Sequence, residues 1–210
     1  MTPRIQLALD LDNCEKALSI AHELNGYWDI LEVGTSLLIS EGLSCVRRMR
    51  NEFEQATILV DTKIIDNAGL IVKIACEAGA DLVTVVSAAA ERTIELAADT
   101  CHSYGCKILL DHLSNNWEDP AFLNKTNLEV DFIGLHLPKD LQGSSRLGRE
   151  KLEKAANSIK KPLAVAGGID HEIASEFSGY PVEIIVIGSY LIDSAVRRAR
   201  AEKLKRVLSC

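Results

Sequence analysis

The sequence predicts an α/β protein in which eight parallel strands close into a single (β/α)8 barrel of the TIM type. Three observations support this fold. Short β-branched, apolar runs alternate with longer segments of helical periodicity. Most of these runs are continuously apolar, which is typical of parallel strands that are covered on both faces. Eight repeats fit within 210 residues, at the lower end of the size range of this barrel.

The predicted strands recur at similar intervals, at Ile5–Leu9, Ile30–Val33, Thr57–Val60, Leu82–Val85, Lys107–Leu110, Phe132–Leu135, Leu163–Ala166 and Ile184–Ile187. Helices are predicted between them, at Cys14–Leu24, Gly42–Glu52, Ala68–Ala78, Ala90–His102, Arg149–Ser158 and Ser194–Leu208. Asn13, Asn67 and Asp193 are suitable N-caps, and Gly79 suits a helix C-terminus. Helix-sized connections favour a parallel sheet. A doubly wound open sheet is the alternative, but no GxGxxG motif follows the first strand to support a nucleotide-binding version.

Composition and charge narrow the classes of partner. Because 47% of the residues are hydrophobic, one domain spanning residues 1–210 can bury a substantial core. The net charge of −7 argues against nucleic acid as the main partner. No apolar run approaches the roughly 20 residues needed to cross a bilayer, and no signal peptide is visible. Six scattered cysteines without CxxC spacing fit a reducing cytoplasm and argue against structural zinc.

Charged residues recur at the ends of the predicted strands. Asp61 and Lys63 follow the third strand, and in extended chain they should point the same way, with Asp66 beyond them. The first, second, fifth and sixth strands carry or precede Asp10, Glu32, Asp111 and His136. Each could be a cap or a surface ion pair. Because the C-terminal ends of barrel strands form one rim where catalysis occurs, we expect these residues to form an active site.

Two glycine-containing turns follow the seventh and eighth strands, Gly167-Gly168 and Gly188-Ser189. Barrels commonly bind phosphate at these two loops, because backbone N–H groups without a side chain nearby can approach phosphate oxygens closely. One such pair alone would favour a simple tight turn. Two pairs at these loops favour a phosphate site, and hence a ligand the size of a sugar phosphate.

The residue types at the rim also suggest roles. Glu32 and Asp61 could supply oxygen ligands to Mg²⁺, which prefers a few carboxylates together with water and substrate oxygens. Lys63 would stabilise an enediolate, and His136 would transfer a proton near neutral pH. The remaining histidines are expected to be structural or exposed: His22, His102, His112 and His171.

The segment Asp61-Thr62-Lys63-Ile64-Ile65-Asp66 resembles the D-x-K-x-x-D signature of the orotidine monophosphate decarboxylase suprafamily. Within it, the chain is most similar to the branch of hexulose-6-phosphate synthase and 3-keto-L-gulonate-6-phosphate decarboxylase. This similarity lies in Gln6–Asp10, in Leu31–Thr35 with Glu41-Gly42, and in Glu77–Asp81 leading into Val83–Val85.

The resemblance implies a (β/α)8 barrel that forms homodimers, with Asp66 entering the active site of the partner. It also implies that Glu32 and Asp61 bind Mg²⁺. Both reactions of the branch pass through a 1,2-enediolate of a pentulose phosphate. The synthase adds formaldehyde to ribulose 5-phosphate, and the decarboxylase releases CO₂ and protonates the intermediate.

Individual positions favour one reaction or the other. Asp111, Ala166 and Ser189 resemble the synthase, whereas Lys139 stands where the decarboxylase has a basic residue. Asn115–Trp117 matches neither. We therefore expect a carbon–carbon lyase, with the synthase reaction first and the decarboxylase reaction second. A non-catalytic barrel that binds sugar phosphates is the alternative from another class.

Overall fold

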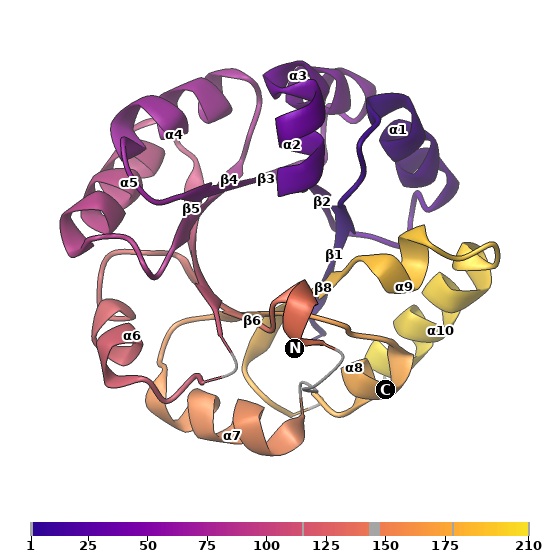
Figure 1. The fold of residues 1–210 in the computed structure, drawn as a ribbon. Coiled ribbons are helices and arrows are strands. Elements are labelled where there is room, and N and C mark those ends of the chain that lie inside the picture. Colours follow the sequence, from indigo (N-terminus) through magenta and orange to yellow (C-terminus); the bar gives the residue numbers. More distant parts are fainter. Residues whose placement is uncertain (1, 115, 143–147, 178, 210) are drawn as a thin grey trace.

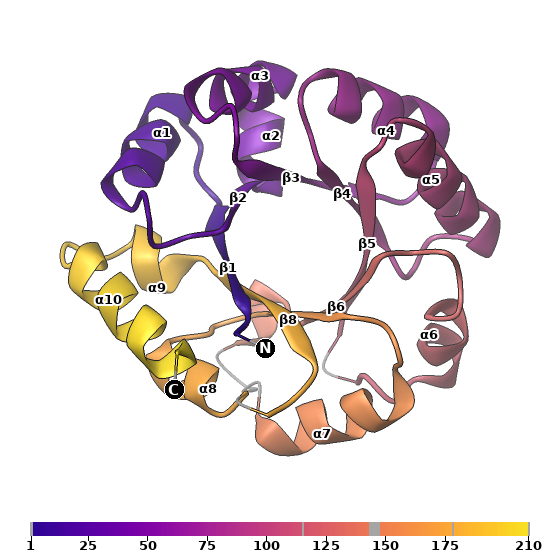
Figure 2. The same cartoon turned by 180° about the vertical axis from the view of Figure 1, so that it is seen from behind.

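The computed structural model is a closed barrel of eight parallel strands surrounded by helices (Figure 1, and from behind in Figure 2). It describes residues 2–114, 116–142, 148–177 and 179–209. The strands pair in chain order, and β8 (Val182–Ile187) closes onto β1 (Arg4–Leu9). The predicted fold is confirmed.

The other strands are β2 (Ile30–Val33), β3 (Thr57–Ile64), β4 (Leu82–Val86), β5 (Lys107–Leu113), β6 (Phe132–His136) and β7 (Leu163–Ala166). The described helices of the first half are α1 (Cys14–Glu23), α2 (Thr35–Glu41), α3 (Leu43–Glu52), α4 (Ala68–Glu77) and α5 (Glu91–Ser103). Those of the second half are α6 (Pro120–Lys125), the 3₁₀ helix η1 (Lys139–Leu141), α7 (Arg149–Ser158), α8 (His171–Ser175), α9 (Ser189–Ile192) and α10 (Arg197–Leu208).

Two strands extend further than the apolar runs that predicted them. β3 continues to Ile64 and β5 to Leu113, because backbone groups of the neighbouring strands continue the ladder beyond the apolar residues. Asp61 and Asp111 therefore lie within strands instead of after them. The prediction that polar residues gather at the C-terminal ends of the strands still holds, because both lie in the last half of their strand.

One of the predicted N-caps was wrong. Asp193 ends α9, and α10 begins later, at Arg197, after a turn in which Ser194 Oγ accepts a hydrogen bond from Val196 N. Asn67 occupies the N-cap position of α4 as predicted, but it has a left-handed conformation and its side chain makes no capping bond. Asn13 does cap α1, and its side chain accepts from Lys16 N. Gly79 follows α4 with a φ of +110°, as predicted for a glycine that ends a helix.

The interior of the barrel is divided into an apolar floor and a polar upper layer. The floor consists of Ile30, Leu59, Leu82, Leu109, Phe132, Ala164 and Ile184. Above it lie the buried polar side chains Gln6, Glu32, Asp61, Thr84 and Asp111. A larger apolar core fills the space between the sheet and the helices. Within the described residues, no helix is long and apolar enough to span a membrane.

Three aspartates at the N-terminal end of the barrel tie consecutive strands together. Each accepts a hydrogen bond at Oδ2, 2.7–2.9 Å long, from the backbone N–H of an isoleucine 23 or 24 residues earlier. The N–H of the same aspartate donates to the carbonyl of that isoleucine. We call these pairs the aspartate bridges: Asp29 with Ile5, Asp81 with Ile58, and Asp131 with Ile108. They stabilise the end of the barrel opposite the polar layer.

Candidate active site

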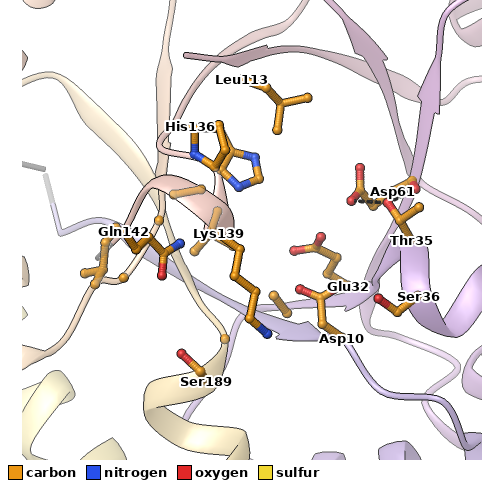
Figure 3. A pocket seen from close by; sticks show the side chains of 18 of the residues that line it. Asp10, Glu32, Thr35, Ser36, Asp61, Leu113, His136, Lys139, Gln142 and Ser189 are labelled. Atoms are coloured by element: carbon orange, nitrogen blue, oxygen red, sulfur yellow. Dashed lines mark hydrogen bonds between the residues drawn. The ribbon is translucent and has the colours of Figure 1, made fainter. Parts of the chain in front are cut away.

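A cavity of about 330 Å³ opens at the C-terminal ends of the strands (Figure 3). Its lining brings together nine residues that the sequence analysis assigned to the charged rim or to the phosphate turns: Asp10, Glu32, Asp61, Lys63, His136, Gly167, Gly168, Gly188 and Ser189. Asp111 lines a recess of about 30 Å³ that continues toward the barrel interior and shares Glu32, Asp61 and Lys63 with the cavity. The predicted rim of charged residues thus surrounds one space.

Asp61 is held by three neighbours. Its Oδ1 accepts from Thr84 Oγ1 at 2.8 Å, and its Oδ2 accepts from Thr35 Oγ1 at 2.7 Å. The Lys63 ammonium also donates to Oδ2, so both side chains point to the same side, as predicted. Lys63 itself has a φ of +45°, which is unusual for a residue other than glycine, and the ladder between β3 and β4 is irregular there. Backbone strain of this kind concentrates at functional positions.

Lys63 lies between two carboxylates. Its ammonium contacts Asp61 and lies 3.7 Å from Asp111 Oδ2. Burial by itself lowers the pKa of Lys63, but the charges of Asp61 and Asp111 outweigh burial, so that the pKa is raised above its usual value. The side chain is therefore a permanent cation at the centre of the site.

His136 is paired with Asp111, which is almost fully buried. The Asp111 oxygens lie 3.2 and 3.3 Å from His136 Nδ1. Because a carboxylate only accepts, Nδ1 carries the proton of the neutral ring, and Nε2 is left as the basic nitrogen. Gly134 of β6 gives this carboxylate room, since a Cβ there would lie 3.1 Å from Asp111 Oδ1.

Glu32 and Asp10 complete an acidic group with Asp61. Glu32 Oε2 accepts from Gln6 Nε2 at 2.7 Å, while Gln6 Oε1 is buried with no partner among the described residues. Burial raises the pKa of Glu32 well above its usual value, and the charges of Asp61 and Asp10 raise it further. The pKa of Asp10 is raised by burial and by Asp61. A cation in this part of the cavity would relieve the repulsion.

The acidic group fits a hard cation that is bound by few protein ligands. Among the described residues, no group of three or more His, Cys, Asp or Glu side chains is arranged to hold a metal ion. Glu32 and Asp61 therefore offer two carboxylates, and water or ligand oxygens would supply the remaining positions. Mg²⁺ is usually bound in this way, whereas structural Zn²⁺ requires four protein ligands.

The two glycine-containing turns follow β7 and β8 and line the same cavity. Gly167 has a φ of +115°, and a Cβ there would lie 2.4 Å from the carbonyl oxygen of Leu137. Only glycine fits this position without a shift of the backbone. At Gly188 a Cβ would meet nothing closer than 3.8 Å, so this glycine leaves open space beside Ser189. An anion could therefore approach the backbone at the turn of Gly188, while Gly167 allows β7 and the segment after β6 to pack closely beside the cavity.

Lys139 is a further cation in the cavity. It belongs to η1, and its side chain extends across the cavity toward Asp10 and Ser189 (Figure 3). Lys139 forms no ion pair with any residue that the structure describes, and its charge acts on the carboxyl of Asp10. It is available to a negatively charged ligand.

Asp66 does not line this cavity. It is exposed in the turn between β3 and α4. Its predicted entry into the site of a partner stays a prediction. Asn115 lies outside the described residues, while Trp117 is buried and donates from Nε1 to Ser114 O.

The other histidines lie outside the cavity. His22 contacts Glu52, His102 contacts Asp131, and His171 contacts Tyr190. His112 is buried against Phe122 and lies 2.7 Å from Ser87 Oγ, and burial lowers its pKa.

Sequence reasoning missed the residues that orient the carboxylates. Gln6 and Thr84 are polar residues inside apolar strands, and this pattern could have identified them as partners of buried polar groups. Thr35 follows Gly34 at the start of α2 and carried no signal of its own.

Comparisons with known proteins agree with this geometry. The model of the Orotidine 5'-phosphate decarboxylase / HUMPS family matches residues 3–204. A 3-hexulose-6-phosphate synthase of Bacillus subtilis (strain 168) is 32% identical over 205 residues, which cover 97% of this chain and 98% of the relative.

Two solved structures extend the similarity to the fold. A 3-hexulose-6-phosphate synthase superposes with a TM-score of 0.90 at 28% identity, over 97% of this chain and 99% of the other. A 3-keto-L-gulonate-6-phosphate decarboxylase of Vibrio cholerae O1 biovar El Tor superposes with a TM-score of 0.88 at 25% identity, over 100% and 98%. The chain is thus similar to proteins that are named for both reactions.

Proposed function

This chain belongs to the Orotidine 5'-phosphate decarboxylase / HUMPS family, and on that premise we propose that it is a Mg²⁺-dependent sugar-phosphate lyase that works through a 1,2-enediolate. Its most favoured reaction is that of 3-hexulose-6-phosphate synthase, the condensation of formaldehyde with ribulose 5-phosphate and its reverse. The observation that carries this proposal is the contact of the Lys63 ammonium with Asp61 and Asp111 inside a cavity that also holds His136. Relatives with 31–32% identity over at least 90% of the chain carry the synthase name.

Each wall of the cavity has a separate role in this proposal. The turns at Gly167-Gly168 and Gly188-Ser189 bind the phosphate through backbone N–H groups. Glu32 and Asp61 would hold Mg²⁺, which when bound would offset negative charge on the two oxygens of the enediolate. Lys63, whose ammonium lies between Asp61 and Asp111, stabilises the negative charge that develops on the enediolate. Asp10 is the third carboxylate of the acidic group and lines the cavity that would hold the substrate.

The proton transfers follow from the pairing of His136 with Asp111. Asp111 accepts from Nδ1–H and stabilises the imidazolium, so that Nε2 can take the proton from carbon 1 of ribulose 5-phosphate. The electrons of the broken C–H bond form the enediolate. Carbon 1 then bonds to the carbon of formaldehyde, whose π electrons move to its oxygen. That oxygen takes the proton back from Nε2, which restores the neutral imidazole.

A direct assay tests this function. Purified protein with Mg²⁺ is given ribulose 5-phosphate with and without formaldehyde, and hexulose phosphate is measured. A parallel reaction offers 3-keto-L-gulonate 6-phosphate and measures CO₂. We expect hexulose phosphate only when formaldehyde is present. If neither reaction proceeds, and Mg²⁺ changes no ligand affinity, the protein is a binding barrel and the lyase proposal is wrong.

The decarboxylase reaction is the second candidate, and Lys139 favours it. The Lys139 side chain extends into the cavity beside Asp10 without an ion pair to a described residue, so that it could bind the carboxylate of 3-keto-L-gulonate 6-phosphate. Release of CO₂ without any hexulose phosphate would select this reaction. Asp111, Ala166 and Ser189 favour the synthase.

We also propose a homodimer in which Asp66 completes the site of the partner. Asp66→Ala should then lose activity, because each site lacks a carboxylate from the other subunit. Mixing Asp66→Ala with Lys63→Ala should restore up to about a quarter of normal activity, because half of randomly mixed dimers contain one intact site.

The control for this experiment is Asp193→Ala, which removes an exposed aspartate outside the cavity and should leave activity unchanged. Subunit exchange is verified by mass-tagged protomers. If exchange is complete and the mixture stays inactive, Asp66 does not act across an interface.

A further inference from the structure

A hydrogen bond at the edge of the cavity, between Tyr190 of its lining and His171 outside it, connects the two glycine-containing turns. α8, α9 and α10 lie side by side next to β8 and β1 (Figures 1 and 2). Tyr190 Oη of α9 lies 2.8 Å from His171 Nδ1 of α8. Tyr190 directly follows Ser189, and His171 lies shortly after Gly168. The bond therefore joins the chain just beyond one turn to the chain just beyond the other.

Lys203 of α10 fixes the direction of this bond. Its Nζ lies 3.3 Å from His171 Nε2. An ammonium can only donate, so Nε2 accepts, and the single proton of the neutral imidazole is on Nδ1. His171 Nδ1–H therefore donates to Tyr190 Oη. Lys203 of α10 thus donates to His171 of α8, and His171 in turn donates to Tyr190 of α9.

Both ends of the bond are held in place. The guanidinium of Arg200 lies 4.7 Å from the centre of the Tyr190 ring, and its Nη1 donates to Tyr190 O at 2.8 Å. The His171 ring stacks on Tyr190 with centroids 5.8 Å apart. The Asp170 carboxylate accepts from Glu172 N and Ile173 N, which fixes the start of α8.

From these contacts we propose that Tyr190 and His171 are positioning residues that hold the two turns at the separation needed to bind one phosphate group between them. This inference rests on the proposed function, because it takes the turns to be the phosphate site. α8 and α9 have only five and four residues, so that few hydrogen bonds of their own hold them in place. Displacement of either turn by a fraction of an ångström would weaken its N–H bonds to the phosphate.

The decisive variant is Tyr190→Phe, which removes only the hydroxyl. We expect KM for ribulose 5-phosphate to rise about three- to tenfold, the effect of losing one neutral hydrogen bond, with kcat within about twofold of normal. Binding of inorganic phosphate, measured by calorimetry, should weaken by a similar factor. With unphosphorylated ribulose, kcat/KM should not change, because no phosphate occupies the turns.

The matched control is Tyr180→Phe. The Tyr180 hydroxyl accepts from Arg149 Nε at 3.0 Å, and neither residue lines the cavity. This variant makes the same chemical change and should leave all three measurements unchanged.

Substitution of His171 tests the bond from its other side. His171→Ala should match Tyr190→Phe, and the double variant should be no weaker in phosphate binding than either single variant. His171→Asn offers an amide N–H near the position of Nδ1 and should retain part of the phosphate affinity. His171→Ala also tests the bond if Tyr190→Phe does not fold.

Two results would overturn the positioning role. One is equal phosphate affinity in Tyr190→Phe and Tyr180→Phe. The other is a loss with unphosphorylated ribulose as large as that with ribulose 5-phosphate, which would indicate a general structural effect. Failure of the proposed function gives a different result. In that case the normal protein forms no hexulose phosphate or CO₂, while Tyr190→Phe still weakens the binding of inorganic phosphate.

Discussion

Lys63→Ala is expected to reduce turnover by a factor on the order of 10³ or more, the loss seen when a group that stabilises an oxyanion is removed. The ammonium contacts Asp61 and lies 3.7 Å from Asp111, so no other described cation can replace it between these two carboxylates. Its removal leaves the enediolate facing two negative side chains. Formation of hexulose phosphate from ribulose 5-phosphate and formaldehyde measures the effect.

The fold should survive this change. Asp61 keeps its hydrogen bonds from Thr35 and Thr84, and the cavity is open to water beside the truncated side chain. Thermal unfolding should therefore show a shift of a few degrees at most. Lys73→Ala is the matched control, since Lys73 lies on the surface of α4 and pairs only with Glu77 among the described residues. Near-normal turnover in Lys63→Ala would reject the enediolate mechanism.

Asp61→Asn is expected to raise the Mg²⁺ concentration for half-maximal activity by about 100-fold. The amide keeps the shape of the side chain but removes the negative charge that a hard cation requires. The same change removes repulsion from Glu32, whose pKa is raised by burial and by the charge of Asp61. Activity is titrated with Mg²⁺, and calorimetry measures metal binding directly.

The control for Asp61→Asn is the same substitution at the other end of the barrel. Asp131 accepts from Ile108 N in an aspartate bridge, so that Asp131→Asn should lower the free energy of unfolding without changing the Mg²⁺ titration. If Asp61→Asn instead left the titration unchanged, Asp61 would not be a metal ligand.

The sequence predicts the strands and the rim of the barrel well, because both depend on local patterns. An apolar run that ends in a charged residue marks a buried strand and the side chain at its end, as at Asp10 and His136. The boundaries of β3 and β5 were missed because pairing with a neighbouring strand, not composition, decides where a ladder ends. Short helices such as α8 and α9 have too few residues to show a period.

The orientation of the carboxylates could not be predicted for a related reason. Asp61 is oriented by Thr35 and Thr84, which lie 26 and 23 residues away in the chain. Such contacts exist only after neighbouring strands have paired, and a threonine in a strand is common whether or not it serves a carboxylate. The left-handed backbone of Lys63 likewise results from the irregular ladder around it.

The aspartate bridges have a consequence for the order in which this protein folds. Each closes a loop of only 23 or 24 residues, so the entropy cost of loop closure is small and nearly the same for all three. The pairs β1–β2, β3–β4 and β5–β6 can thus form as separate βαβ units before the ring closes.

Each unit brings two ionisable residues to the rim. They are Asp10 with Glu32, Asp61 with Lys63, and Asp111 with His136. The pair β7–β8 has no aspartate bridge among the described residues, and it contributes only the uncharged turns that face the cavity. The repulsion of Asp61 with Asp10 and Glu32 therefore arises only when the first two units meet, whereas Asp10 and Glu32 already repel each other within the first unit.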